Sequence, residues 1–333
     1  MWTNAKAWEW YRSHPWTVGF NYVPSSAVNS TEMWQTESFD EEGIRKELAL
    51  AGNTGFNAVR VFLPFLVWNH ERAKFMGNLE TFLQIAWENG MRTVPILFDD
   101  CAFSNLEPYL GPQKPPVPGI HNSGWTPSPG FYIADDPLCW EKLQQYVTEI
   151  LTTYGHDDRI LFWDLYNEPG NSKRKMKCLP LLRQTFTWAR EASPSQPLTA
   201  CVWAWEAFDL ECASLSDVVT FHDYSPVETT RKRVEGLRSF DRPLFCTEWL
   251  HREAGCTFES HLPYYAEENI GIFQWGLVTG KTQTYLNWEP EKNPQEGMPE
   301  IWQHDIFDKD FSPYRPEEIL LLQNTLKQSR RKV

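Results

Sequence analysis

Short apolar runs alternate with longer amphipathic segments along the whole chain. Short apolar runs are typical of buried strands, and the amphipathic segments between them are typical of helices. This alternation predicts βα units around a parallel sheet. Eight candidate strands lie near Trp16–Tyr22, Ala58–Leu63, Arg92–Phe98, Ile160–Tyr166, Leu198–Trp203, Val218–His222, Leu244–Thr247 and Gly271–Trp275. Because eight strands close a βα barrel, we predict the α/β class and a single (β/α)8 TIM barrel over residues 1–333.

Capping residues mark several of the helices between these strands. Asp, Asn and Ser side chains can accept hydrogen bonds from the first free N–H groups of a helix, and glycine often follows its end. The sequence therefore predicts helices from Asp40 to near Gly52, from Asn78 to before Gly90, and from Asp136-Pro137 to Gly155. A short helix near residues 1–14 precedes the first strand, and a last helix near 315–330 carries an apolar stripe of Ile319, Leu320, Leu322 and Leu326.

Two long βα loops follow the third and eighth predicted strands. Residues 104–129 are rich in proline and show little periodicity, and residues 276–299 include Trp288 as a candidate platform for a ligand. Long loops in compact domains are often functional, and loops that follow barrel strands surround the active-site face. We expect both loops to wall a pocket, which favours an exo-like pocket over an open cleft.

Charge and cysteine usage narrow the class of protein. The formal net charge of -13 argues against a nucleic-acid surface, and the one dense basic run, Lys173–Lys177, is interpreted as a solvated loop. The seven cysteines are scattered without a CxxC pair, so we expect neither a zinc site nor a disulfide framework. With no long apolar run and no apolar leader, a full-length chain is expected to be cytoplasmic and not bound to a membrane. If a signal peptide has been removed, the protein is expected to be periplasmic or secreted instead. The oligomeric state stays open.

Two glutamates end apolar runs at the predicted catalytic face. Glu168 belongs to Asn167-Glu168-Pro169, directly after the fourth strand, and Glu248 ends the seventh. The carboxyl ends of all barrel strands meet on one face, so the two side chains are predicted to face each other. A retaining glycosidase needs one acid that donates a proton to the leaving oxygen and one carboxylate that attacks the sugar. Glu168 is the candidate acid/base and Glu248 the candidate nucleophile, and neither role needs a metal or another cofactor.

The motifs at the other strand ends resemble those of clan A glycoside hydrolases, close to family 5. Arg60, in Asn57-Ala58-Val59-Arg60-Val61, resembles the arginine of the second strand, and His222-Asp223-Tyr224 resembles the His-x-Tyr of the sixth strand. Trp275 resembles the tryptophan that lies under the bound sugar. The resemblance implies that Arg60, Asn167, His222, Tyr224 and Trp275 surround the substrate, that Arg60 keeps the nucleophile ionised, and that Tyr224 hydrogen-bonds it.

The sequence departs from family 5 at one position. Family 5 enzymes typically carry a histidine just after the third strand, whereas this chain has Phe98-Asp99-Asp100-Cys101. Asp99 and Asp100 are candidates either for binding a pair of sugar hydroxyls or for a turn. Tryptophans near loops and strand ends are candidate sugar platforms, of which we expect about half to be structural. They are Trp34, Trp68, Trp125, Trp203, Trp205 and Trp288, with Trp203 and Trp205 favoured because they end the fifth strand.

These observations predict retaining hydrolysis of a β-linked glycoside or oligosaccharide, with the β configuration implied by the family resemblance. A transglycosylase of the same clan uses the same residues and shields the intermediate from water. A noncatalytic carbohydrate-binding barrel is expected to lack one of the two acids, and both are present. The sugar and its linkage cannot be deduced from the sequence.

Overall fold

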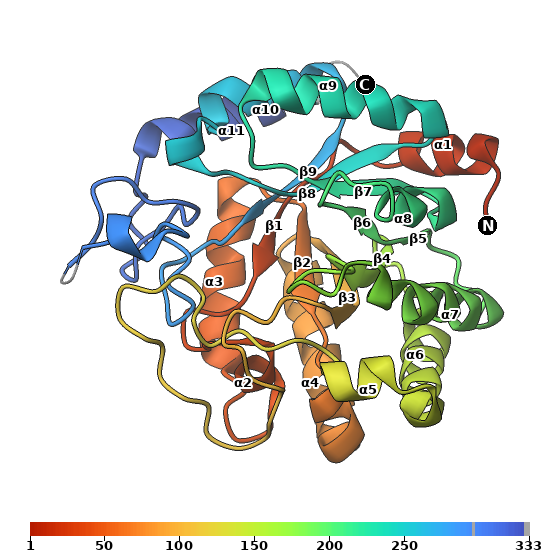
Figure 1. The fold of residues 1–333 in the computed structure, drawn as a ribbon. Coiled ribbons are helices and arrows are strands. Elements are labelled where there is room, and N and C mark those ends of the chain that lie inside the picture. The colour runs from red at the N-terminus through yellow and green to blue at the C-terminus, as the bar shows by residue number, and fades with distance from the viewer. Residues whose placement is uncertain (295–296, 330–333) are drawn as a thin grey trace.

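The computed structural model describes residues 1–294 and 297–329 and contains one parallel sheet. Its strands are β1 (Val18–Tyr22), β2 (Ala58–Phe62), β3 (Arg92–Asp99), β4 (Trp163–Asn167), β5 (Leu198–Thr199), β6 (Cys201–Val202), β7 (Val219–His222), β8 (Leu244–Trp249) and β9 (Gly271–Trp275). The strand order β5-β4-β3-β2-β1-β9-β8-β7-β6 begins and ends with the two halves of one broken strand. The predicted (β/α)8 barrel is therefore confirmed, and its fifth strand is interrupted at Ala200 (Figure 1).

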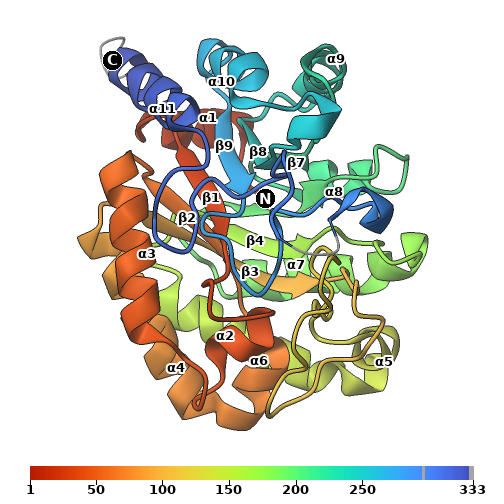
Figure 2. The same cartoon turned by 90° about the vertical axis from the view of Figure 1, so that its left-hand side faces the viewer.

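Helices form a ring around these strands, as Figure 2 shows. They are α1 (Asn4–Arg12), α2 (Ser30–Trp34), α3 (Glu41–Thr54), α4 (Phe65–Glu88), α5 (Phe131–Asp135), α6 (Trp140–Tyr154), α7 (Leu179–Glu191), α8 (Leu210–Leu215), α9 (Val227–Leu237), α10 (Phe258–Glu267) and α11 (Pro316–Ser329). Asp40 caps α3 through the N–H of Gly43, and Asp136 caps the short 3-10 helix 137–139 that leads into α6. These caps agree with the sequence prediction, although α3 ends at Thr54 with Gly55 as its C-cap, two residues beyond Gly52.

Two of the helix predictions are wrong. Asn78 does not begin a helix: it lies inside α4, which starts at Phe65, and its side-chain amide donates to the carbonyl of Trp34. Phe65, Val67 and Trp68 bury one side of the first turns, and this packing extends the helix upstream of the capping signal. Leu320 is 58% exposed and so lies off the buried face of α11 that includes Leu322 and Leu326.

The amino-terminal end of the barrel is filled by aromatic side chains. Tyr11 of α1 packs against Phe162, Phe245 and other residues of the strands, with Trp8 and Trp10 beside them. Gly19 of β1 makes room for this packing, since a Cβ there would lie 2.5 Å from the ring of Phe273. Filled in this way, the barrel is a packed core, and its opposite, carboxyl-terminal end is free to hold a site.

The two long loops meet over that carboxyl-terminal end. The Asn122 N–H donates to the Thr282 carbonyl at 2.8 Å, and the Asn293 side chain donates to the Gly119 carbonyl at 2.9 Å. The Gln283 side-chain amide donates to the backbone carbonyls of Val117 and Ile120, at 2.7 and 2.9 Å. Figures 1 and 2 show the two segments side by side at the mouth of the barrel. As the sequence predicts, the loops wall a common space.

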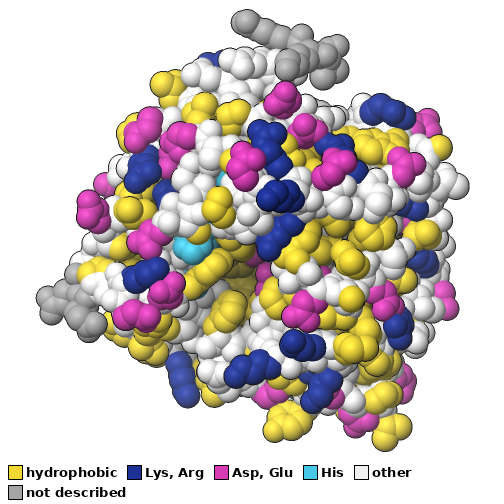
Figure 3. All heavy atoms as spheres, turned by 45° about the horizontal axis from the view of Figure 1, so that its top comes forward, with side chains coloured by type: hydrophobic (Ala, Val, Ile, Leu, Met, Phe, Trp, Pro, Cys, Tyr) yellow, Lys and Arg dark blue, Asp and Glu magenta, His cyan; other side chains and the backbone are white. Residues whose placement is uncertain are grey.

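The surface mixes charges of both signs. On the face shown in Figure 3, acidic and basic side chains are interspersed with hydrophobic ones. In residues 1–294 and 297–329, no helix combines the length and the apolar character needed to cross a bilayer. The seven cysteines are free thiols.

Candidate active site

Glu168 follows β4 directly, in a turn that the backbone holds in an unusual conformation. Its φ of 41° lies in the left-handed region, which non-glycine residues rarely adopt, and its N–H donates to the Cys201 sulfur at 3.1 Å. The turn is also fixed by Asp100, whose carboxylate accepts the N–H of Gly170 at 2.8 Å. The strained residue is thereby held with its side chain in the pocket.

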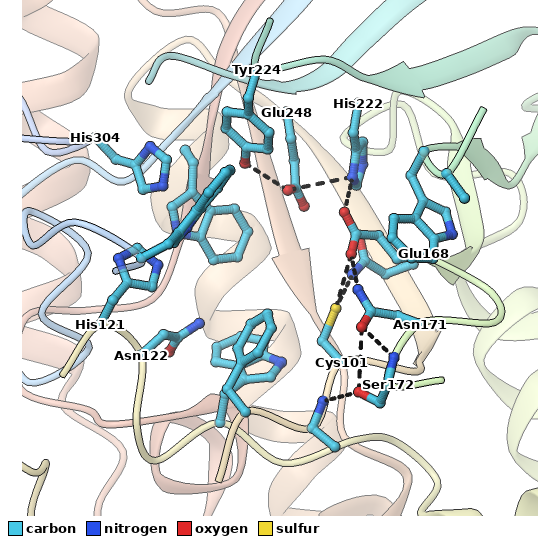
Figure 4. Close-up of a pocket in the computed structure, with 18 of the residues that line it drawn as sticks. Cys101, His121, Asn122, Glu168, Asn171, Ser172, His222, Tyr224, Glu248 and His304 are labelled. Atoms are coloured by element: carbon cyan, nitrogen blue, oxygen red, sulfur yellow. Dashed lines mark hydrogen bonds and ion pairs between the residues drawn. The ribbon is translucent and has the colours of Figure 1, made fainter. Parts of the chain in front are cut away.

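Three side chains contact the Glu168 carboxyl group. The thiol of Cys101 donates to Oε2 at 3.2 Å, the amide of Asn171 donates to the same oxygen, and His222 Nδ1 lies 2.8 Å from Oε1. Figure 4 shows these groups converging on Glu168. Burial raises the pKa of Glu168, although the Cys101 and Asn171 hydrogen bonds lower it in part.

Glu248 lies inside β8 and is held by groups of a different kind. Arg60 Nη1 donates to Oε1 at 3.1 Å, and the Tyr224 hydroxyl donates to Oε2 at 2.8 Å. A register irregularity between β7 and β8 places His222 opposite Glu248. Burial raises the pKa of Glu248 above its ordinary value, and the nearby Arg60 charge offsets only part of this increase. The guanidinium still favours the ionised form, and Glu168 lacks such a direct cationic partner.

One oxygen of Glu168 and one of Glu248 lie within 4.8 Å of each other and of a His222 nitrogen. Burial lowers the pKa of His222 to about 4, so its ring is neutral at ordinary pH. The three residues offer a donor set that resembles a metal site. However, the Arg60 guanidinium bonded to Glu248 disfavours a cation there, and Tyr224, Cys101 and Asn171 already bond the carboxyl oxygens. The geometry suits a pair of reacting carboxyl groups better than a metal.

Three predicted substrate contacts are corrected by the structure. Arg60 is fully buried and binds Asp164, Asn21, Asn167 and Glu248, so it positions the site from beneath. The Asp99 carboxylate accepts from Trp125 at 2.7 Å and from Asn167 at 2.9 Å, and burial raises its pKa to about 7. Asp100 binds Tyr166 and Gly170 and pairs with Arg174 at 3.0 Å. The aspartates and Arg60 are occupied by protein groups and lie outside the pocket lining.

The remaining predicted residues surround a cavity of about 810 Å³, a size typical of small-ligand pockets. Asn167, Glu168, His222, Tyr224, Glu248 and Trp275 all line it. Of the six candidate platform tryptophans, Trp34 and Trp68 are buried in the core, whereas Trp125, Trp203, Trp205 and Trp288 reach the cavity. Trp203 is anchored by its indole N–H, which donates to the Pro169 carbonyl at 2.9 Å.

Several lining residues were missed by sequence reasoning. They are Phe62, Cys101, Ala102, Phe103, Asn105, His121, Asn122, Asn171, Ser172, Ala204, Asp223, Arg233 and His304. Most of them lie in the long loops or two to four residues beyond a recognised motif. Cys101 and Asn171 had a usable signal, because each closely follows a strand-end acidic residue. His121 and His304 had none, since only the folded loops bring them together.

The sequence matches no family model and no curated protein, but its fold is widely represented among solved structures. An exo-β-1,4-mannosidase from Opitutaceae bacterium strain TAV5 aligns with 95% of this chain at 19% identity and a TM-score of 0.66, and the chain spans 60% of that protein. A family 5 mannosidase from Rhizomucor miehei aligns over 95% of this chain and 94% of its own, with 12% identity and a TM-score of 0.61. An endo-β-1,4-mannanase from Thermotoga petrophila aligns over 96% of this chain and 78% of its own, with 12% identity and a TM-score of 0.60.

These likenesses confirm the predicted (β/α)8 barrel, a fold that the chain shares with solved family 5 glycoside hydrolases. At such low identity they establish the architecture and not the activity.

Proposed function

We propose that this protein is a retaining glycoside hydrolase that cleaves β-linked glycosides. The observation that carries the proposal is the pair Glu168 and Glu248, with carboxyl oxygens within 4.8 Å of each other in the same pocket. Retaining enzymes hold these groups about 5 Å apart, whereas inverting enzymes separate them by about 6.5–9.5 Å to admit a water. The different partners of the two acids support different roles for them.

In the first step, a Glu248 oxygen attacks the anomeric carbon while the bond to the leaving oxygen breaks. Glu168 gives its proton to that oxygen, and a covalent glycosyl-enzyme forms. In the second step, Glu168 takes a proton from water, whose oxygen attacks the same carbon and releases Glu248. Nδ1 of neutral His222 is an acceptor in one tautomer and a donor in the other, so it can pair with both protonation states of Glu168.

The β configuration is supported by the solved structures that share the fold. Their names describe an exo-β-1,4-mannosidase, an endo-β-1,4-mannanase and, among other matches, a β-glucuronidase from Faecalibacterium prausnitzii. Each of these names specifies a β-linked glycoside. We therefore propose β-mannosides as the first substrates to test, followed by β-glucuronides.

The proposal is tested by replacing the two acids separately. Glu248→Ala removes the nucleophile and should lower turnover of every aryl β-glycoside to background. Glu168→Ala should still form the glycosyl-enzyme from a substrate with a good leaving group, and azide should then restore turnover by replacing the missing base. The azide product should be the β-glycosyl azide, identified by NMR.

Exposed Glu228 provides the matched control, and Glu228→Ala should retain full activity. If wild-type protein cleaves none of the aryl β-glycosides, the proposed activity is wrong. If both active-site variants yield the same azide anomer, the two roles are wrongly assigned. Products that grow when an acceptor sugar is added would instead identify the enzyme as a transglycosylase.

A further inference from the structure

One end of the pocket is lined by side chains from the two long loops. His121 and Asn122 come from the loop after β3, and Trp288 and His304 come from the loop after β9. The rings are packed together: the centroids of His121 and His304 lie 5.3 Å apart, and those of His121 and Trp288 lie 6.3 Å apart. The Tyr224 ring adjoins Trp288 at 4.9 Å, so this wall begins beside the Glu248 carboxylate. We call His121, Asn122, Trp288 and His304 the end wall.

The end wall and Glu168 lie on opposite sides of Glu248. In Figure 4, His304, His121 and Asn122 stand on one side of the pocket, and Glu168, Asn171 and Ser172 stand on the other. Glu168 is the proposed proton donor to the leaving oxygen, so the leaving group must lie on its side. The sugar that reacts with Glu248 therefore has its non-reducing end directed toward the end wall.

The end wall is fixed by the loop contacts behind it. Asn122 is 1% exposed and its N–H donates to the Thr282 carbonyl, while His121 Nδ1 lies 2.8 Å from the Leu286 carbonyl. Because a carbonyl only accepts, Nδ1 of His121 carries the proton. Burial lowers the pKa of His121 to about 4, so the ring is neutral and Nε2 keeps a free lone pair. These contacts tie both loops together at this end of the pocket.

The end wall also has unused hydrogen-bonding capacity. The side-chain oxygen of Asn122 is buried without a hydrogen-bond partner among the described residues, although Asn122 lines the pocket. A buried amide oxygen without a partner is costly, and such groups commonly mark a ligand site. The Asn122 side chain, which lines the pocket, and the lone pair of His121 therefore give the wall polar groups that can bind hydroxyl groups of a terminal sugar.

We propose that the end wall makes this enzyme exo-acting: it removes one sugar at a time from the non-reducing end of a β-linked oligosaccharide. His121 and Asn122 determine this specificity by binding hydroxyl groups of the terminal sugar. The leaving chain extends past Glu168 toward Trp203 and Trp205, where indole faces line the other part of the pocket. This proposal rests on the proposed glycosidase function and adds the end of the oligosaccharide at which the enzyme cleaves.

The proposal is tested with chains of the sugar whose aryl β-glycoside the enzyme cleaves. A β-1,4-linked tetrasaccharide labelled at its reducing end should yield labelled trisaccharide and free monosaccharide as the first products. Methylation of the terminal 4-hydroxyl should slow hydrolysis at least about a hundredfold, because the methyl group meets the end wall. Early release of disaccharide, or equal cleavage of the capped chain, would overturn exo action. Failure on every aryl β-glycoside would instead reject the underlying function.

Two variants address the wall residues themselves. Asn resembles the Nδ1 side of histidine, so His121→Asn keeps the donor to Leu286 and removes the Nε2 acceptor. Asn122→Asp is isosteric and introduces a charge beside the sugar. Each should reduce kcat/KM for the uncapped tetrasaccharide about tenfold, mainly through KM, as expected for one lost hydrogen bond to the substrate. Melting temperatures measured in parallel show whether the variants fold.

His156→Asn and Asn324→Asp, at exposed positions, are the matched controls and should match wild type. Folded wall variants with wild-type KM values would contradict the binding role of the wall.

Discussion

At the scale of single residues, the two acids are distinguished by what donates to them. Glu248 accepts from a guanidinium and a phenol, while Glu168 accepts from a thiol and an amide and adjoins a neutral imidazole. The cation beside Glu248 favours its ionised form. The neutral donors to Glu168 lower its pKa less than burial raises it. We therefore expect Glu248 to ionise first, which leaves Glu168 to hold the proton that the first step consumes.

Cys101 allows this difference to be tested through the pH profile. The thiol lowers the pKa of Glu168 by hydrogen-bonding its ionised form. The proposed mechanism requires protonated Glu168, so kcat/KM should fall as pH rises through that pKa. Cys101→Ala removes the donor, raises the pKa and should move the alkaline limb of the kcat/KM profile to higher pH. The acidic limb, which reports Glu248, should move less.

Cys101→Ser is the matched control, because its hydroxyl keeps a donor at the same place and should leave the alkaline limb near its wild-type position. A purely structural Cys101 would give variants with altered activity but identical limbs.

The strand-end residues were predictable from sequence because strand ends are marked locally. An apolar run that stops at Glu168, Glu248, Tyr224 or Trp275 shows which side chain reaches the mouth of the barrel. The sequence pattern does not show which groups a side chain contacts at the mouth of the barrel. Asp99 and Asp100 end a strand in the same way, yet Trp125, Asn167, Tyr166 and Arg174 occupy their oxygens. Those partners are distant in sequence or belong to a loop, so the sequence could not separate binding from scaffolding.

At the scale of elements, the loops after β3 and β9 act as one unit. Their contacts join residues 117–122 to residues 282–293, segments that leave no shared pattern in the sequence. The strands were predicted to within a few residues because burial imposes an apolar run on each. The break in the fifth strand at Ala200 and the true start of α4 were not, since tertiary packing decides both.

Asn293 is the side chain with which we test the loop unit. Its amide donates to the Gly119 and Asn287 carbonyls at 2.9 Å each, and its oxygen accepts the Asn287 N–H at 2.8 Å. Asn293→Ala leaves these buried groups without partners, at a cost of about 1–3 kcal/mol to the local structure. We expect faster proteolytic cleavage within residues 104–129 and a raised KM, with little change in melting temperature.

Exposed Asn324→Ala provides the comparison for this loop variant. Wild-type proteolysis and KM in the Asn293→Ala protein would mean that the loops hold their positions independently.

At the scale of the whole molecule, one buried ion pair links the barrel to its last helix. Arg252, just after β8, binds Glu318 of α11 through Nε and Nη2 at 2.9 and 2.6 Å, and both side chains are 1% exposed. Arg252 Nη1 also donates to the carbonyls of Trp302 and Asp305. The guanidinium of Arg252 therefore joins the end of β8, the loop at residues 302–305 and α11, and it is positioned to couple the unfolding of these elements.

Glu318→Ala should destabilise the protein by about 3–5 kcal/mol, because it leaves the Arg252 charge buried without its partner. Thermal and urea unfolding followed by circular dichroism measure the loss, and kcat at low temperature should stay near wild type, since the pair lies outside the catalytic pocket. The double variant Arg252→Met, Glu318→Leu removes both charges and should recover part of the lost stability, although two carbonyls lose their donor. A double variant no more stable than Glu318→Ala would show that α11 is held by its apolar face and not by compensation of the buried charge.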